Sequence, residues 1–300
     1  MSEALPPREA WKGFRERLAA VGFRPSRRLG QNFLLDENLT RALVRDAGVQ
    51  RGEFVLEVGP GLGFLTRPLL DAGARVLAVE VDERLFELLS QDLGQRTELE
   101  LLRADALAGK HQLGAEVLER LPSAGEWQVV ANLPYAISAP LMVVLSELEA
   151  PPRSMSVLVQ REVAERICAG PGGGQWGPIS VRLQAAYSVR LGRTLGTAMF
   201  WPRPKVDSAM VHLELRADAP SRADRAQLSA LTSALFHRRR QVLGRVLGEA
   251  LGDRSQALEL LAGLGIDPGA RAETLSLEAL GALALSPEWV ARSRNTRDPD

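Results

Sequence analysis

The chain has 300 residues, of which 45% are hydrophobic and 25% charged, and its 37 basic and 37 acidic residues leave no formal net charge. This composition is typical of a globular protein with a core large enough to fold independently, and it excludes a strongly basic or acidic polypeptide. The single cysteine, Cys168, excludes an internal disulfide and predicts a reducing, cytoplasmic location, and because no long apolar run exists we expect neither a membrane span nor a secretory signal.

The first 170 residues show a regular alternation of strand and helix patterns. Residues 1–22 form an expected frayed helical extension, and Asp36 is the expected N-cap of a helix over 36–49. The following elements are strands expected at 54–59, 75–82, 99–105, 127–133 and 154–160, with helices at 64–73, 83–93, 138–148 and 161–170. This alternation predicts an α/β fold with a mostly parallel, Rossmann-like sheet, helices on both faces, and ligand binding at the carboxyl ends of the strands.

The alternation ends after residue 170. A flexible, glycine-rich loop is expected at 171–178, and a proline-rich turn then leads into a strand within 201–215. Helical patterns follow at 224–236, 238–251, 255–264 and 276–284. We therefore expect an N-terminal extension at 1–22, an α/β domain at 23–217 and a small C-terminal all-α domain at 218–300, whose last nine residues are disordered.

Two basic clusters stand out against the zero net charge. One contains Arg24, Arg27 and Arg28, and the other contains Arg238, Arg239, Arg240 and Arg245. Local patches of positive charge can bind phosphate groups whatever the net charge of the chain. Short runs of charge are also common on solvated helix faces, so neither cluster alone decides for a nucleic-acid partner.

A glycine-rich turn, "EVGPGLGFLT" (57–66), follows the strand at 54–59. Gly59, Gly61 and Gly63 let the backbone approach a ligand where a Cβ would clash. The dinucleotide fingerprint needs its third glycine one residue later, where this chain has Phe64. The spacing therefore disfavours a nicotinamide-dependent dehydrogenase and favours a nucleoside ligand without a phosphate, such as S-adenosylmethionine.

Two carboxylates end the next two predicted strands. Glu80 lies 21 residues after Gly59 and can accept hydrogen bonds from both hydroxyls of a ribose. Asp105 can accept one from the exocyclic amine of adenine, with the apolar neighbours Val81 and Ala106 covering the ring. Either carboxylate alone would be an ordinary surface group, but three strand ends in register predict a methyltransferase-like cofactor site.

The stretch "NLPY" (132–135) follows the fourth strand at the same edge of the sheet. An adenine amine is a poor nucleophile because its lone pair is delocalised into the ring. The side-chain oxygen of Asn132 and the carbonyl of Leu133 can accept hydrogen bonds from the two amine hydrogens. Pro134 restricts the backbone that aims this carbonyl, and Tyr135 offers a ring for base stacking. Positioning and electrostatics would then lower the barrier to methyl transfer without a metal or a strong base. Taken alone, Asn-Leu-Pro-Tyr could equally be a simple turn.

Five motifs together resemble those of the small-subunit (16S) ribosomal RNA adenine-N6,N6-dimethyltransferase family (KsgA-type). The motifs are "GQNFLLD", "EVGPGLGFLT", "NLPYAIS", "FWPRPKVDSAMV" and "GIDPGARAETLS", and the similarity runs from about residue 28 to about residue 283. The resemblance implies a class I methyltransferase that uses S-adenosylmethionine. It also implies dimethylation of two adjacent adenosines in a hairpin loop near the 3′ end of small-subunit rRNA during maturation of the subunit, by an enzyme expected to be monomeric.

The resemblance also implies roles for individual residues. The expected cofactor-binding residues are Asn32, Leu34, Gly59, Gly61, Glu80, Val81, Asp105, Ala106 and Asn132. The expected catalytic group is Asn132, Leu133, Pro134 and Tyr135, with Phe200 as a second aromatic wall for the target base. Contacts to rRNA are expected from Arg27, Arg28, Arg238, Arg239, Arg240 and Arg245, which would position the RNA without reading its sequence.

The sequence departs from the family pattern at two positions. Ala136 stands where the family commonly has asparagine, and Trp176 replaces a tyrosine before a glycine. We expect little effect from either, because residues 132–134 already supply the amine-binding groups and an aromatic ring is retained. The alternatives are a large-subunit rRNA adenine methyltransferase of the antibiotic-resistance type, which "PRPKVDSA" and "GIDPGARAETLS" disfavour, and an assembly factor that binds RNA without catalysis.

Overall fold

The computed structural model describes residues 11–26, 29–109, 111–124 and 126–295. Their contacts divide the chain into two compact units. The first unit takes in the described parts of Met1–Leu145, Ala150–Ala164 and Arg190–Glu214, and the second takes in those of Ser146–Glu149, Glu165–Val189 and Leu215–Asp300. Among the described residues, no helix has the length and apolar character needed to cross a membrane.

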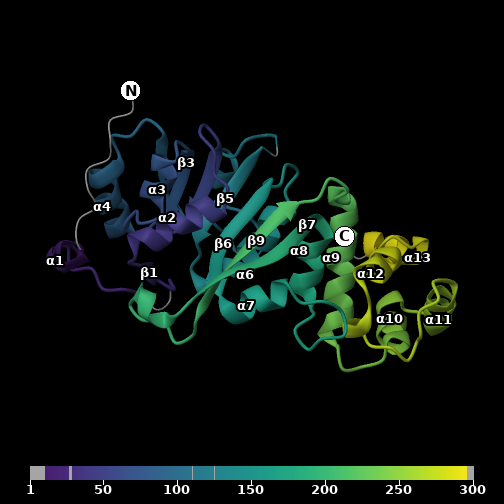
Figure 1. Ribbon diagram of the computed structural model, residues 1–300. Coiled ribbons are helices and arrows are strands. Elements are labelled where there is room, and N and C mark those ends of the chain that lie inside the picture. Colours follow the sequence, from purple (N-terminus) through teal and green to yellow (C-terminus); the bar gives the residue numbers. More distant parts are fainter. Residues whose placement is uncertain (1–10, 27–28, 110, 125, 296–300) are drawn as a thin grey trace. The chain divides into compact units, whose positions relative to one another are not determined.

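A mostly parallel sheet forms the centre of the first unit (Figure 1). Its order is β4-β3-β2-β5-β6-β9-β7, and the first five strands are parallel while β9 is antiparallel to β6. The strands span Phe54–Val58 (β2), Arg75–Glu80 (β3), Leu99–Arg103 (β4), Trp127–Asn132 (β5), Ser154–Gln160 (β6), Tyr187–Leu195 (β7) and Ser208–Leu215 (β9). The chain moves outward from β2 through β3 to β4 and then returns to β5 on the other side of β2. The carboxyl ends of β2 and β5 therefore meet at the switch point, where open α/β sheets bind ligands.

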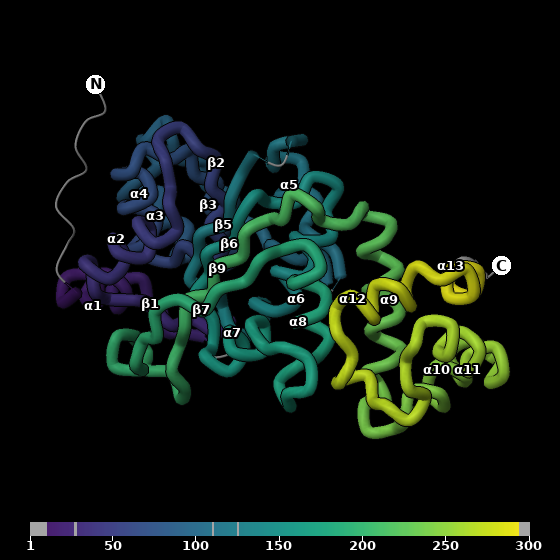
Figure 2. The backbone as a smooth tube through the Cα atoms, turned by 45° about the vertical axis from the view of Figure 1, so that its right-hand side comes forward, coloured from purple at the N-terminus to yellow at the C-terminus, as the bar shows by residue number. Residues whose placement is uncertain are grey.

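Helices alternate with these strands along the first part of the chain (Figures 1 and 2). They span Trp11–Ala20 (α1), Glu37–Asp46 (α2), Thr66–Asp71 (α3), Glu83–Leu93 (α4), Ala115–Leu118 (α5), Tyr135–Ser146 (α6) and Arg161–Ile167 (α7). Asp36 caps α2, since its side chain accepts a hydrogen bond from the Leu39 amide, and Asp82 caps α4 in the same way. The alternation predicted from hydrophobic periodicity is confirmed, although α6 begins three residues earlier than the predicted 138.

A separate two-stranded sheet joins segments far apart in the sequence. Phe33–Leu34 (β1) pairs antiparallel with Phe200–Trp201 (β8). A short 3₁₀ turn, Thr197–Met199, precedes β8. Neither short strand was expected from the sequence, because two residues are too few for a periodic pattern.

Helices make up most of the second unit. They span Pro178–Ala186 (α8), Arg222–His237 (α9), Leu243–Leu251 (α10), Arg254–Gly263 (α11), Leu277–Ala284 (α12) and Pro287–Asn295 (α13). The last of these extends into the residues expected to be disordered. The unit also includes residues before the expected boundary at 217, because Trp176, Val181 and Ala185 are part of its apolar core. Trp176 is 1% exposed, so the glycine-rich segment that carries it is packed at this point and is not a free loop.

Candidate active site

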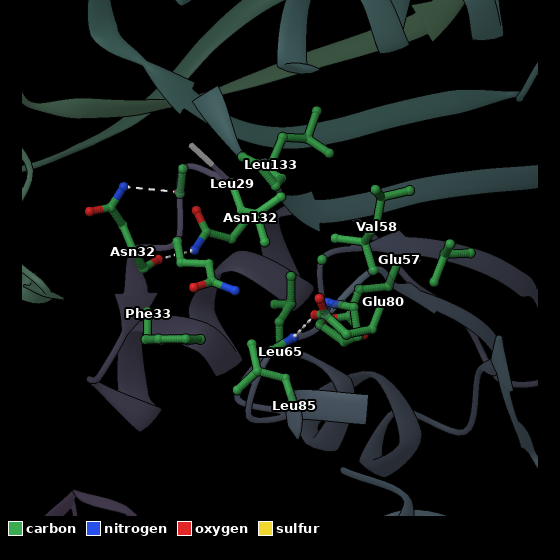
Figure 3. A pocket seen from close by; sticks show the side chains of 18 of the residues that line it. Leu29, Asn32, Phe33, Glu57, Val58, Leu65, Glu80, Leu85, Asn132 and Leu133 are labelled. Carbon is green, nitrogen blue, oxygen red and sulfur yellow. Dashed lines mark hydrogen bonds between the residues drawn. The ribbon is translucent and has the colours of Figure 1, made fainter. Parts of the chain in front are cut away.

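The first unit contains a pocket at the carboxyl ends of its parallel strands (Figure 3). Together with the open space at its mouth it takes in about 920 Å³. Residues between Leu29 and Ile137 in the sequence line it. All twelve residues predicted at the cofactor or the catalytic group are among them: Asn32, Leu34, Gly59, Gly61, Glu80, Val81, Asp105, Ala106, Asn132, Leu133, Pro134 and Tyr135.

The glycine-rich turn after β2 forms one side of the pocket. Gly59 and Gly61 have φ angles of 73° and 57°, which side chains other than glycine rarely adopt. A Cβ on Gly59 would lie 3.3 Å from the Pro134 ring, and one on Gly61 would lie 2.7 Å from the Phe33 ring. The two glycines therefore let the turn pack closely against the residues after β5 and against β1.

Glu80 lies at the end of β3 with its carboxylate fixed by two main-chain amides. Its Oε2 accepts a hydrogen bond from the Gly61 amide at 3.0 Å, and its Oε1 accepts one from the Asp82 amide at 2.9 Å. The residue is 4% exposed, and burial raises the pKa of its carboxyl to about 7. A carboxyl buried beside a pocket gains stabilisation from donors that arrive with a ligand.

Glu57 is a second buried carboxyl of the pocket, and it is not among the residues predicted from the sequence. It lies in β2 between Leu56 and Val58 and is 1% exposed. Burial raises the pKa of its carboxyl to about 8, and the nearby Glu80 carboxyl adds to the rise. Its Oε2 has no hydrogen-bond partner among the described residues. An acidic residue inside a central parallel strand, where both faces are buried, is the sequence signal that could have identified it.

Asn132 ends β5 and faces the pocket from the opposite side (Figure 3). Its Nδ2 donates a hydrogen bond of 2.9 Å to the main-chain carbonyl of Asn32. The Asn32 side chain in turn donates to the Gly30 carbonyl at 3.1 Å. Next to Asn132, the Leu133 amide donates to the Leu158 carbonyl, and no main-chain amide of the described residues donates to the carbonyl of Leu133. Two acceptors, the Asn132 side-chain oxygen and the Leu133 carbonyl, therefore receive no hydrogen bond from the main-chain amides of the described residues.

Tyr135 begins α6 at the mouth of the same pocket. Its hydroxyl lies 2.7 Å from the Ser208 hydroxyl at the start of β9. The side chain is half-buried, and burial raises the pKa of its phenol, so the hydroxyl is neutral at physiological pH. The ring is thus held by the α6 backbone at one end and by the Ser208 hydroxyl at the other, while part of the side chain remains exposed.

Asp105 and its apolar neighbours lie at the other end of the pocket. Asp105 is exposed, and its Oδ1 accepts a hydrogen bond from the Leu107 amide at 3.0 Å. Val81 is 46% exposed although it is apolar, whereas Ala106 is buried. An exposed valine beside an exposed carboxylate at a pocket offers one apolar and one polar contact to a flat base.

Phe200 does not lie at this pocket. It pairs with Leu34 in the β1–β8 sheet and is 4% exposed within an apolar core that includes Leu34, Leu195 and Met210. The prediction that Phe200 forms a second wall for a target base is therefore not supported by this structure. Alternate residues of a strand face opposite sides, and the aromatic residue on the other side of β8 is Trp201.

The predicted RNA-contacting arginines are only partly described. Arg27 and Arg28 lie outside the described residues. Arg238, Arg239 and Arg240 lie in the turn between α9 and α10 of the second unit and are exposed. Arg238 and Arg245 both form ion pairs with Glu249. Glu249 supplies one negative charge to two of the four arginines, so the cluster keeps most of its positive charge, and Arg239 and Arg240 add theirs to the surface of the unit.

Metal ligation was not expected, and the described residues contain no group of three or more histidine, cysteine or acidic side chains suited to hold a metal. Ala136 is exposed and is not part of the pocket lining, unlike its neighbours Tyr135 and Ile137.

Comparisons with known proteins give the same family as the motifs. The sequence model described as "Ribosomal RNA adenine dimethylase" matches residues 22–284. A protein of Leifsonia xyli named "Ribosomal RNA small subunit methyltransferase A" is 42% identical over 271 residues, covering 88% of this chain and 93% of its own length. A protein of the same name from Phenylobacterium zucineum is 41% identical over 279 residues, covering 93% of both chains.

Solved structures share the fold. A dimethyladenosine transferase from Plasmodium falciparum superposes with a TM-score of 0.70 at 20% identity, covering 86% of this chain and 97% of its own. The 23S rRNA methyltransferase ErmE superposes with a TM-score of 0.62 at 24% identity, covering 84% and 98%. At these identities the likeness concerns the fold alone. The family match over most of the sequence goes further, and the chain belongs to the ribosomal RNA adenine dimethylase family.

Proposed function

We propose that this protein transfers methyl groups from S-adenosylmethionine to N6 of two adjacent adenosines in the 3′-terminal hairpin loop of small-subunit rRNA during ribosome maturation. The observation that carries the proposal is the position of Asn132. Its anchored amide lies at the switch point of the sheet, in the same pocket as Glu80 and Asp105. The names of the relatives support small-subunit rRNA over large-subunit rRNA as the substrate.

The pocket residues fit S-adenosylmethionine. Glu80, held by two main-chain amides, would accept hydrogen bonds from the ribose hydroxyls. Asp105 would accept one from the adenine amine, and Val81 would cover the ring. The Oε2 of Glu57 has no hydrogen-bond partner among the described residues, and the positive charge of the cofactor's ammonium would lower the raised pKa of this carboxyl and pair with its ionised form. When bound, the cofactor supplies an electrophilic methyl group on its sulfonium.

The remaining pocket residues suit an adenine amine. The side-chain oxygen of Asn132 and the carbonyl of Leu133 would each accept a hydrogen bond from one amine hydrogen, which orients the nitrogen lone pair toward the methyl group. Tyr135 would stack on the base, and base–aromatic stacking contributes about 1–3 kcal/mol. Catalysis would thus come from alignment and electrostatics and would need no strong base.

The RNA itself would contact basic groups outside the pocket. Arg239 and Arg240, exposed in the α9–α10 turn, are suited to phosphate contacts that position RNA without reading its sequence. A hairpin loop is a favourable target, because its bases leave the stack at little energetic cost. The enzyme would act as a cytoplasmic monomer on immature small subunits.

The test is methyl transfer from labelled S-adenosylmethionine to purified ribosomal particles. Immature small subunits from cells that lack this activity should accept label, and large subunits should not. Protein-free small-subunit RNA serves as a third sample and distinguishes a naked RNA substrate from a preassembled particle. Labelling of large subunits alone would replace the proposal with the large-subunit alternative, and no labelling of any sample would favour a non-catalytic assembly factor.

A further inference from the structure

The N-terminal helix α1 (Trp11–Ala20) packs onto the first unit, beside the residues that line the pocket. Its apolar residues Trp11, Phe14 and Leu18 recur at helical spacing and share one face. Phe14 and Leu18 are each 2% exposed. A helix of ten residues is marginal alone in water, so burial of this face against the unit is what stabilises it.

The face meets a cluster of aromatic rings. Trp11 lies 4.9 Å from Trp201 and 6.5 Å from Phe64 between ring centroids, and Phe14 lies 4.9 Å from Phe64 in an edge-to-face arrangement. Trp201 is stacked with Phe33 at 6.0 Å. Such ring pairs stabilise the packing beyond the effect of the area that they bury. Phe33 and Phe64 both line the cofactor pocket, whereas Trp11 and Phe14 do not.

An ion pair holds the other side of α1. Arg17 donates two hydrogen bonds, of 3.0 and 2.7 Å, to the carboxylate of Asp92 on α4. The same carboxylate lies 3.8 Å from Arg67 on α3. The pair is partly buried, with side-chain exposures of 31% and 17%, and its geometry is bidentate. Asp92 therefore ties α1 to the helix that follows the glycine-rich turn.

The packing of α1 reaches Glu80 through a chain of four contacts, which begins with Trp11 on Trp201 and continues with Trp201 on Phe33. The Phe33 ring lies so close to Gly61 that a Cβ there would be 2.7 Å from it. The Gly61 amide in turn donates the hydrogen bond that fixes Glu80 Oε2. Displacing the Phe33 ring would free the Gly61 backbone to move, and with it one of the two donors that hold the carboxylate.

Residues 29–32 line the pocket and are called the lip segment here, and the packing of α1 fixes the chain shortly before them. After α1 the chain turns back at Gly22, and the Phe23 amide donates to the Leu18 carbonyl at 2.8 Å. Phe23 is buried in the cluster beside Phe33, at 6.1 Å between ring centroids. The segment ends at Asn32, whose carbonyl accepts the hydrogen bond from Asn132. Both Figure 1 and Figure 2 show α1, in purple, near β1 in this part of the chain.

We propose that α1 is a positioning element of the cofactor site: Trp11 and Arg17 hold the Phe33–Phe64 wall and the lip segment in the geometry that binds S-adenosylmethionine. The inference rests on the proposed function in one respect, namely that this pocket holds the cofactor. Neither residue lines the pocket, so each acts through the rings, the Gly61 backbone and Asp92. The site consequently depends on a helix that lies outside the stretch matched by the family model, residues 22–284.

The experiment measures cofactor affinity by calorimetry and thermal unfolding without cofactor, on the full chain. Trp11→Ala and Arg17→Ala should each weaken binding of S-adenosylmethionine about tenfold, and Trp11→Phe should retain most of the affinity. Arg193→Ala is the matched control. This substitution likewise removes an arginine from an ion pair, because Arg193 pairs with Asp46 in a distant segment of the same unit. Neither Arg193 nor Asp46 lines the pocket. Steady-state rates should show a raised KM for the cofactor in Trp11→Ala with kcat changed much less.

The outcomes separate the two proposals. If Trp11→Ala and Arg17→Ala lower the melting temperature as Arg193→Ala does but leave affinity unchanged, α1 is a structural helix only and the inference is overturned. Glu80→Ala serves as the reference for the pocket itself. Weaker binding in Glu80→Ala with unchanged binding in the α1 variants rejects the role of α1 alone. Unchanged binding in Glu80→Ala rejects the assignment of the pocket.

Discussion

The side-chain amide of Asn132 donates to the main-chain carbonyl of Asn32, 100 residues earlier in the chain, at 2.9 Å. This bond fixes the orientation of the amide plane, because the nitrogen is engaged and the oxygen is left for a substrate. The segment that covers the pocket and the residue proposed to hold the target amine are thereby joined.

Replacing Asn132 tests its proposed role directly. Asn132→Ala should reduce the rate of methyl transfer by about 10²–10³-fold, the range for removal of one positioned polar group, while cofactor binding remains largely intact. Single-turnover kinetics and calorimetry on the same preparation measure the two effects separately. Dimethylation at the normal rate in this variant would show that the amide does not orient the amine.

Replacing Glu80 tests ribose recognition. Glu80→Ala should weaken cofactor affinity by about 1.5–3 kcal/mol, because the variant lacks a buried carboxylate that accepts charge-assisted hydrogen bonds. Glu83→Ala is the control, since Glu83 lies three residues away and pairs on the surface with Arg103. Equal affinities of the two variants would contradict the assignment.

The raised pKa of Glu57 predicts a pH dependence of stability. The carboxyl has a pKa of about 8 in the folded chain, against an ordinary value of 4.5. Between these values the folded state holds a proton that the unfolded state has released, so the free energy of unfolding falls as pH rises from about 5 to 8. Glu57→Gln removes this titration.

Thermal unfolding without cofactor is the measurement. Glu57→Gln should unfold at a higher temperature than the unaltered protein at pH 8, with a gain of at least about 1.4 kcal/mol, the equivalent of one pKa unit. The gain should shrink toward pH 5. Glu116→Gln, at an exposed position on α5, should show no such trend. A gain that is the same at both pH values would show that Glu57 is ionised in the folded protein.

The exposed arginines of the α9–α10 turn predict a salt dependence of RNA binding. Arg239→Glu should weaken binding to immature small subunits and lower the slope of log affinity against log salt by about 0.7–0.9, because one phosphate is no longer neutralised by the protein. Arg254→Glu at the start of α11 makes the same change of charge elsewhere in the second unit. Equal slopes for the two variants would indicate that Arg239 belongs to an ordinary solvated surface.

The departure at Ala136 predicts a small effect. The residue is exposed and does not line the pocket, so Ala136→Asn should change the methylation rate by no more than about twofold, as is usual for surface substitutions. A large rise in rate would mean that residue 136 contacts the reacting groups in the complex with RNA.

Much of the first unit could be predicted from local patterns. Strands such as β6 and helices such as α4 have the predicted bounds, because apolar periodicity and caps act over a few neighbouring residues. The pocket followed from one further rule, that parallel strands expose their carboxyl ends at one edge. This rule brings Gly59, Glu80 and Asn132 together although the sequence separates them widely.

Features that depend on distant partners could not be predicted in this way. The family resemblance implied that Phe200 lies beside a target base, but its side chain is buried where β8 pairs with β1, a strand from a distant part of the sequence. Glu57 was not predicted although an acidic residue in a central strand is unusual, because the sequence does not show which neighbouring strands complete a pocket around it. The role of α1 likewise depends on rings and a carboxylate from later elements.

The most direct measurement of the central claim is nucleoside and fragment mass spectrometry of small-subunit RNA after incubation of immature subunits with the protein and labelled S-adenosylmethionine. The proposed function predicts two labelled N6,N6-dimethyladenosines at adjacent positions in the 3′-terminal hairpin loop, and neither in the Asn132→Ala sample. Label at another base, at another atom of adenine, or in large-subunit RNA alone would contradict it.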